Sequence, residues 1–156
     1  METNEKLIEV LNGLIEINND RVNGYKKAAE ETKDLDMDLK AIFHSLANDS
    51  QKYGGELSKV VSDLGGTPAD GTTNSGRIYR VWMDIKTTFT AHDRQSVLEL
   101  CEFGEDAAQK AYKVAIASDA EMNADIRQLI VEQQAKLKTS HDMIKKYRDM
   151  HQTVNA

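Results

Sequence analysis

The sequence predicts an all-α protein, folded as an antiparallel bundle of four long helices with a long crossover between the second helix and the third. Three observations support this class. Only one proline, Pro68, occurs among 156 residues, so few positions oblige a helix to end. Apolar residues recur three and four positions apart in four long segments. The first and third connections between the helices are short and the second is long. This pattern joins the helices into two antiparallel pairs.

Each of the four segments carries its own helical signals. Asn4 and Asp93 are candidate N-caps of the first and third helices, and the fourth begins near Asn123 or Ala124. The dipeptide Gly65-Gly66 is a strong signal for the end of the second helix. A chain of this length commonly forms one domain, so we expect a single domain over residues 1–156. Its helices are expected at about residues 4–31, 37–64, 93–118 and 123–150.

The crossover, residues 65–92, has two parts. Residues 65–76 are rich in turn-forming residues, and we expect a flexible connector there. The second part has an apolar residue at nearly every helical turn, which predicts a short helix that caps the bundle. Its aromatic residues and arginines also allow an alternative role as an association surface. The apolar positions are Ile78, Val81, Trp82, Ile85 and Phe89.

Composition excludes several classes of protein. The formal net charge is -6, which argues against nucleic acid as a partner because phosphate binding needs a basic surface. We expect no membrane span, since no run of about 18 apolar residues occurs. The acidic N-terminus is not typical of a signal peptide. The lone Cys101 cannot form an internal disulfide, so a cytoplasmic location is expected.

One polar residue interrupts the apolar stripe of the first helix. Leu11 and Leu14 begin the stripe and Tyr25 and Ala28 continue it, with Asn18 between them. Buried polar groups are costly unless they find hydrogen-bond partners. We therefore expect other polar residues to meet Asn18 inside the bundle.

The two halves of the chain show a weak internal similarity. Placing Tyr25 over Tyr112 aligns the apolar positions of the first and third helices and puts Asn18 on Glu105. The second helix overlays the fourth in the same way, with Ser50 on Gln133. A duplication and a chance match of two amphipathic patterns both explain this similarity.

The sequence lacks the usual metal-binding patterns of helical bundles. Two-metal bundles use an inward Glu from each of two helices and a Glu-x-x-His from each of the other two. The four histidines are His44, His92, His141 and His151, and the residues three positions before them are Ala41, Phe89, Lys138 and Arg148. No Glu-x-x-His therefore occurs, and the single cysteine with scattered histidines gives no zinc pattern.

Several stretches resemble an uncharacterised bacterial family of ferritin-like four-helix bundles, a domain-of-unknown-function family. They are FHSLANDSQKYGGEL, GGTP, GTTNSGRIYRVWMDIK, GEDAAQKAYK and VEQQAKLKTSHDMI, spread over nearly the whole chain. The resemblance implies a ferritin-like antiparallel four-helix bundle and brings no established activity. A more distant similarity to diiron proteins such as rubrerythrin implies where metal ligands would stand.

Only one of those six ligand types is kept. The resemblance puts Glu105 at a ligand position, while residues of other types replace the rest of the set. We expect these residues to form a metal-free, vestigial ligand layer, with Lys136 and Glu105 as its charged centre. The alternative is that Lys136 reaches solvent and Glu105 lies at the bundle edge. The six positions are Asn18, Ser50, Tyr53, Glu105, Gln133 and Lys136.

The expected function follows from this layer. We expect no cofactor, no metal and no catalytic residues. The leading hypothesis is a non-enzymatic bundle protein that forms a homo-oligomer or binds a protein partner, in a stress setting by analogy with ferritin-like proteins. The alternatives are a metal-binding oxidoreductase or ferroxidase with an atypical acidic site, and a small-ligand pocket between the helices. The acidic residues of the third helix, which a solvated face also explains, are Glu99, Glu102, Glu105 and Asp106.

Overall fold

The fold is a bundle of four long helices, seen in a computed structural model that describes residues 2–31, 37–73 and 94–155. The helices are α1 (Glu2–Glu31), α2 (Met37–Asp63), α5 (Arg94–Ala117) and α6 (Ala124–Asn155). The described residues contain no strand, which confirms the predicted all-α class. None of the described helices is both long and apolar enough to cross a membrane.

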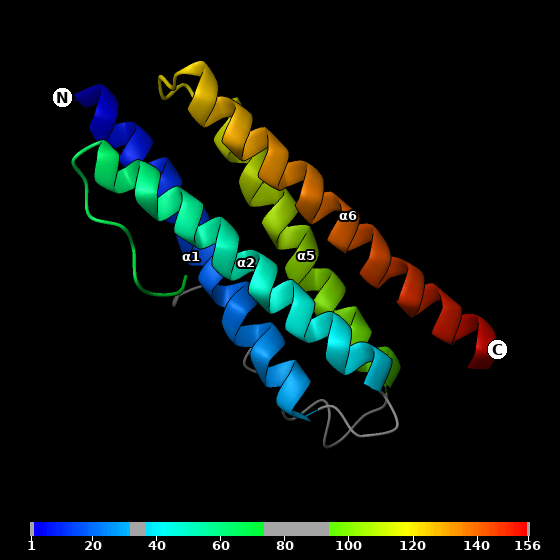
Figure 1. The fold of residues 1–156 in the computed structure, drawn as a ribbon. Helices are drawn as coiled ribbons and strands as arrows, with labels where there is room; N and C mark the ends of the chain where they lie inside the picture. Colours follow the sequence, from blue (N-terminus) through cyan, green and yellow to red (C-terminus); the bar gives the residue numbers. More distant parts are fainter. Residues whose placement is uncertain (1, 32–36, 74–93, 156) are drawn as a thin grey trace.

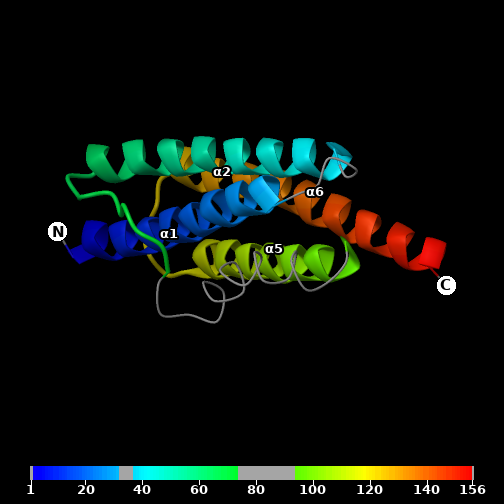
Figure 2. The same ribbon diagram turned by 90° about the horizontal axis from the view of Figure 1, so that it is seen from below.

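The helices form two neighbouring pairs. Helix α1 lies along α2, and α5 lies along α6, while α1 also contacts α5 and α2 contacts α6 (Figures 1 and 2). The observed helix ends fall within two residues of the expected positions, except that α6 continues to Asn155. In both views the last turns of α6 extend past the other helices.

Helix α2 ends in a glycine motif, as the sequence predicts. Gly65 has φ of 87°, a left-handed conformation that favours glycine. Its N–H donates to Ser62 O at 3.0 Å, and the Gly66 N–H donates to Val61 O at 2.9 Å, which together make a Schellman motif. Gly66 also lies against Ile8 of α1, where an added Cβ would come within 2.8 Å of that side chain.

The first part of the crossover is fastened along α1. Asn12 binds it twice, donating to Thr67 O at 3.1 Å and accepting from Ala69 N–H at 2.8 Å. Asn19 donates to Gly71 O at 2.8 Å. Side chains of α1 thus bond to backbone groups of residues 67, 69, 71 and 73 within the expected connector, whose residues 74–76 lie outside the described residues. The expected helix around Trp82 lies outside the described residues.

Asp20 holds the last described residue of this segment, Thr73, and its burial predicts that the stability of the fold depends on pH. It is 2% exposed and accepts two hydrogen bonds from Thr73, from the hydroxyl at 2.6 Å and from the N–H at 3.2 Å. Burial raises the pKa of Asp20, and the Thr73 hydrogen bonds offset only part of that rise. The folded state therefore binds this proton more tightly than the unfolded state, so Asp20 lowers stability as pH rises above about 4.

We expect Asp20→Asn to melt at a higher temperature than the parent protein at pH 7, with the difference vanishing as pH falls to about 4. Thermal unfolding followed by circular dichroism from pH 3.5 to 8 measures this difference. Asp70→Asn changes an exposed carboxylate of the same segment and is the matched control. A constant difference between Asp20→Asn and the parent at all pH values would contradict the assignment.

The apolar core consists of two clusters. One is built around Leu11, Leu57 and Tyr112, and the other around Tyr25, Phe43 and Leu98. On α1, α2 and α5, buried polar residues stand between the segments that belong to the two clusters. This polar level is the chemically distinctive part of the core.

Candidate functional site

The polar layer of the core is the candidate functional site. It receives side chains from all four helices, and each of them is at most 1% exposed. Its members are Asn18, Arg21 and Tyr25 of α1, Ser50 of α2, Glu105 and Tyr112 of α5, and Gln133 of α6. The layer has a charged half and a neutral half.

An ion pair forms the charged half. Arg21 Nη2 lies 2.6 Å from Glu105 Oε1, and both side chains are at most 1% exposed. Arg21 also donates to the Ser50 hydroxyl, and the Tyr25 hydroxyl donates to the same Glu105 oxygen. Burial alone would lower the pKa of Arg21, but the Glu105 carboxylate raises it above its ordinary value. The guanidinium therefore stays charged inside the core.

Tyr25 is held from two sides. The Arg21 guanidinium lies 5.4 Å from the centre of its ring, a cation–π contact. Its ring stacks on Phe43 with centroids 5.7 Å apart. Burial and the nearby Glu105 raise the pKa of Tyr25 well above its ordinary value, so its hydroxyl remains a proton donor to the carboxylate. Packing thus positions the donor that completes the charged half.

A chain of amides and hydroxyls forms the neutral half. Asn18 Nδ2 donates to the Tyr112 hydroxyl at 2.9 Å, and that hydroxyl donates to Gln133 Oε1 at 2.7 Å. Gln133 Nε2 in turn lies 3.3 Å from the Tyr53 carbonyl and 3.3 Å from Glu56 Oε1. Burial raises the pKa of Tyr112, which keeps its hydroxyl protonated. Asn18, whose position in the sequence raised the question of a partner, is therefore paired across the bundle.

The two halves are related by the internal similarity of the sequence. The overlay that matches Tyr25 with Tyr112 also matches Asn18 with Glu105. In the structure Tyr25 of α1 bonds to Glu105 of α5, and Tyr112 of α5 bonds to Asn18 of α1. Each hydrogen bond is thus the counterpart of the other under exchange of the two helix pairs. Tyr25 donates in its bond and Tyr112 accepts in the other, and both a duplication and a chance match of apolar patterns are compatible with this correspondence.

Five of the six expected layer residues are buried, and one is not. Asn18, Ser50, Tyr53, Glu105 and Gln133 are buried, although the backbone carbonyl of Tyr53 makes the contact with Gln133. Lys136 is exposed, so the expected Glu105–Lys136 charged centre is wrong. The next residue, Leu137, occupies the buried position on this turn of α6. Lys136 keeps its ammonium group in water and so avoids the desolvation cost of burying a charge.

The cation of the layer is Arg21, which the sequence interpretation missed. Its position was readable, because Arg21 stands three residues after Asn18 and four before Tyr25 on the same stripe. The partner that makes its burial tolerable lies 84 residues away in the sequence, on α5.

The layer offers a poor set of donors for metal ions. Hard cations in helical bundles are held by several carboxylates, together with imidazoles in two-metal sites. Within the layer Glu105 is the one carboxylate, and a guanidinium is bonded to it. Amide and hydroxyl groups fill the other positions: Asn18, Tyr112 and Gln133 are bonded in a chain, and the hydroxyls of Ser50 and Tyr25 bond to the ion pair. The arrangement is suited to holding the four helices in register.

Comparison with known proteins agrees with the fold. A family model described as domain of unknown function (DUF2383) matches residues 6–118. Among curated proteins, none matches the sequence. A solved structure of a Dps1 mutant from Mycobacterium smegmatis is similar with a TM-score of 0.76 at 11% identity, covering 94% of this chain and 97% of that one. A structure described as ferritin-like, diiron-carboxylate proteins from Bacillus anthracis is similar with a TM-score of 0.73 at 20% identity, covering 95% of this chain and 99% of that one.

Proposed function

Because the chain belongs to the uncharacterised ferritin-like family described as DUF2383, we propose that it is a non-enzymatic bundle protein that acts by binding a second copy of itself. In this proposal the layer is the remnant of a diiron site and has a structural role. The expected stress setting remains a prediction.

A single observation carries the loss of the diiron site: the guanidinium of Arg21 lies 2.6 Å from the Glu105 carboxylate in the middle of the bundle. Diiron-carboxylate chemistry, named for one of the similar structures, needs several anionic ligands around two cations. The layer of this chain supplies one anion and its own cation, so its residues do not fit a metal pair. Repulsion from Arg21 would oppose a metal ion at Glu105.

Metal loading tests this part of the proposal. Purified protein incubated with Fe²⁺ or Mn²⁺ and desalted should retain no pair of iron or manganese ions per chain by elemental analysis, and it should not accelerate Fe²⁺ oxidation. Two iron or manganese ions per chain, lost in Glu105→Gln, would instead establish the rival oxidoreductase or ferroxidase. Circular dichroism of both proteins confirms that the variant is folded.

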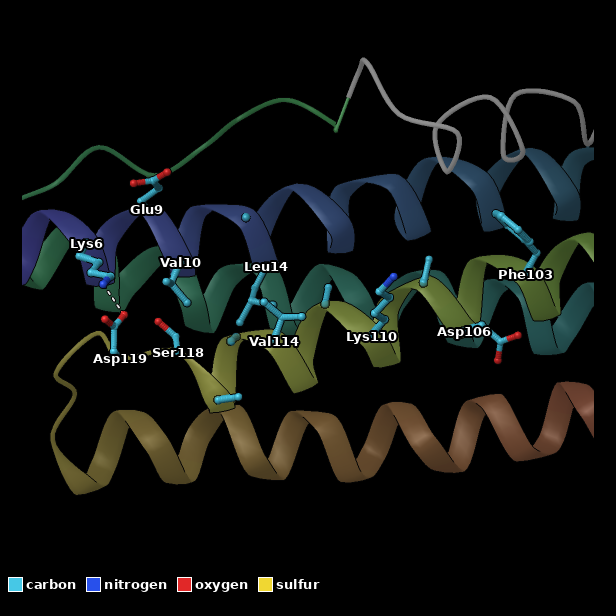
Figure 3. A pocket seen from close by; sticks show the side chains of 15 residues that line it. Lys6, Glu9, Val10, Leu14, Phe103, Asp106, Lys110, Val114, Ser118 and Asp119 are labelled. Atoms are coloured by element: carbon cyan, nitrogen blue, oxygen red, sulfur yellow. Dashed lines mark ion pairs between the residues drawn. The ribbon is translucent and has the colours of Figure 1, made fainter.

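A groove between α1 and α5 is the surface proposed for self-association. It has a volume of about 1250 Å³. Val10 and Leu14 of α1 face Val114 of α5 along it, and Phe103 lies toward one end (Figure 3). Val114 is 63% exposed, which is unusual for an apolar side chain beside other apolar groups. Covering this groove would remove apolar surface from water.

The charges around the groove favour a second copy over a strongly charged partner. Lys6 and Lys110 line it together with Glu9, Asp106 and Asp119, so both signs are present on one surface. Lys6 and Asp119 form an ion pair at one end of the groove (Figure 3). A surface that carries both signs can be complementary to itself, as a twofold dimer requires.

We expect Val114→Asp to weaken self-association by roughly 100-fold, because burying an unpaired carboxylate in an interface costs several kcal/mol. Sedimentation equilibrium or light scattering over a concentration series measures the change. Val131→Asp on α6 is the matched control, since Val131 is 43% exposed and lies outside the groove lining. A parent protein that stays monomeric, or an equal loss in both variants, would contradict the proposed surface.

A further inference from the structure

We propose that Glu102, Asp106 and His141 form a binding site for one zinc ion that links α5 to α6 on the surface of the bundle. This site is separate from the polar layer. It does not depend on the proposed self-association, and its readout is zinc binding.

The donor atoms are already gathered. One carboxylate oxygen from Glu102, one from Asp106 and one imidazole nitrogen from His141 all lie within 4.8 Å of one another. Glu102 and Asp106 are four residues apart on α5, so they project from the same helical face. Asp106 extends toward α6, which carries His141 (Figure 3). The site therefore has three donors from two helices, and one of the three is an imidazole.

His141 is oriented by a neighbour. Its Nδ1 lies 3.2 Å from Asp142 Oδ1, while its Nε2 contacts Asp106. With Asp142 accepting the Nδ1 proton, a zinc ion at Nε2 would displace the proton that Nε2 shares with Asp106. Metal-binding histidines commonly have such a carboxylate on the other ring nitrogen. The His141 ring is 19% exposed, so packing limits its movement while the ion can reach it.

The donor types favour zinc over magnesium or calcium. Imidazole suits zinc and other transition metals, whereas magnesium and calcium prefer sites made only of oxygen ligands. Three protein donors and one water complete the tetrahedral coordination that zinc adopts. Two carboxylates supply a charge equal and opposite to that of the ion. A zinc ion would replace the direct contact between His141 and Asp106.

Arg148 competes with the ion. Its Nη1 atom is bonded to Glu102 Oε2, and its Nη2 atom lies 2.9 Å from Asp149 Oδ1. A guanidinium on Glu102 lowers the affinity of that carboxylate for a second cation. Removing the Arg148 charge should therefore tighten zinc binding, whereas a cluster with only a structural role would show no change in zinc affinity.

Zinc titration of the full chain, stripped of metal with a chelator, tests the site by calorimetry and by competition with a chromogenic chelator. We expect one zinc ion per chain and no comparable heat with Mg²⁺. His141→Gln should weaken zinc binding by at least about 100-fold, and Asp142→Asn by about 10- to 100-fold. His44→Gln removes an exposed histidine of α2 and should leave the affinity unchanged.

Arg148→Gln separates the proposal from adventitious binding, because it should bind zinc at least several-fold more tightly than the parent. Zinc binding that is equally weak in the parent, His141→Gln and Arg148→Gln would overturn the site. Stoichiometric binding lost in His44→Gln but kept in His141→Gln would overturn it as well. Circular dichroism of each variant without zinc shows that the bundle is intact.

Discussion

Replacing Glu105 with alanine is expected to lower the free energy of unfolding by about 3–5 kcal/mol, because it leaves the Arg21 guanidinium buried without a counter-charge. Arg21 and Glu105 are both fully buried, and the Tyr25 hydroxyl loses its acceptor at the same time. Chemical denaturation with urea measures the loss. Glu99→Ala changes an exposed carboxylate of the same helix and should alter stability by no more than about 0.5 kcal/mol.

A double variant separates the cost of an unpaired charge from the net contribution of the ion pair. Arg21→Met combined with Glu105→Leu removes both charges and fills similar volume, so it should recover most of the stability lost in Glu105→Ala. The ion pair would then serve to align the helices more than to stabilise them. A double variant less stable than Glu105→Ala would show that the ion pair itself is strongly stabilising.

Phe43→Ala is expected to have the second large effect, a loss of about 3–5 kcal/mol, because it leaves a cavity in the core. Phe43 is fully buried and stacks on Tyr25. Removing it frees the ring whose hydroxyl donates to Glu105, so the damage should extend to the charged half of the layer. The loss of near-ultraviolet circular dichroism from the tyrosines should accompany the drop in the urea midpoint.

Phe43→Leu provides a graded control. It keeps most of the buried apolar volume and should cost clearly less than the alanine variant. If both variants cost the same, or if Phe43→Ala costs under about 1 kcal/mol, Phe43 would not support Tyr25 as described. Comparing Phe43→Ala with and without Tyr25→Phe would then measure the coupling between the Phe43 ring and the Tyr25 hydroxyl.

The fold was predictable because its signals are local. The apolar period of each helix and the glycines after α2 are read from neighbouring residues. The described residues contain the four expected long helices, with a Schellman motif after α2. The attachment of residues 67–73 to α1 was not predictable in this way. Nothing in the sequence around Asn12 and Asn19 marks them, and their partners are more than 50 positions away.

The candidate site was predictable in part for the same reason. Asn18 stood out because a polar residue broke an apolar stripe, and Glu105 was found through the resemblance to ferritin-like proteins. The choice between Lys136 and Arg21 as the buried cation depends on distances across the bundle, which spacing along one helix does not contain. Only the structure shows Arg21 against Glu105 and Lys136 at the surface.

The positive charge at the centre of the bundle is carried by the polypeptide itself, in the guanidinium of Arg21. A cation that belongs to the polypeptide has no dissociation constant, so chelators cannot extract it and a wrong ion cannot take its place. Under the proposed function, this layer is therefore complete as soon as the chain has folded, and its formation should not depend on the supply of iron in the medium.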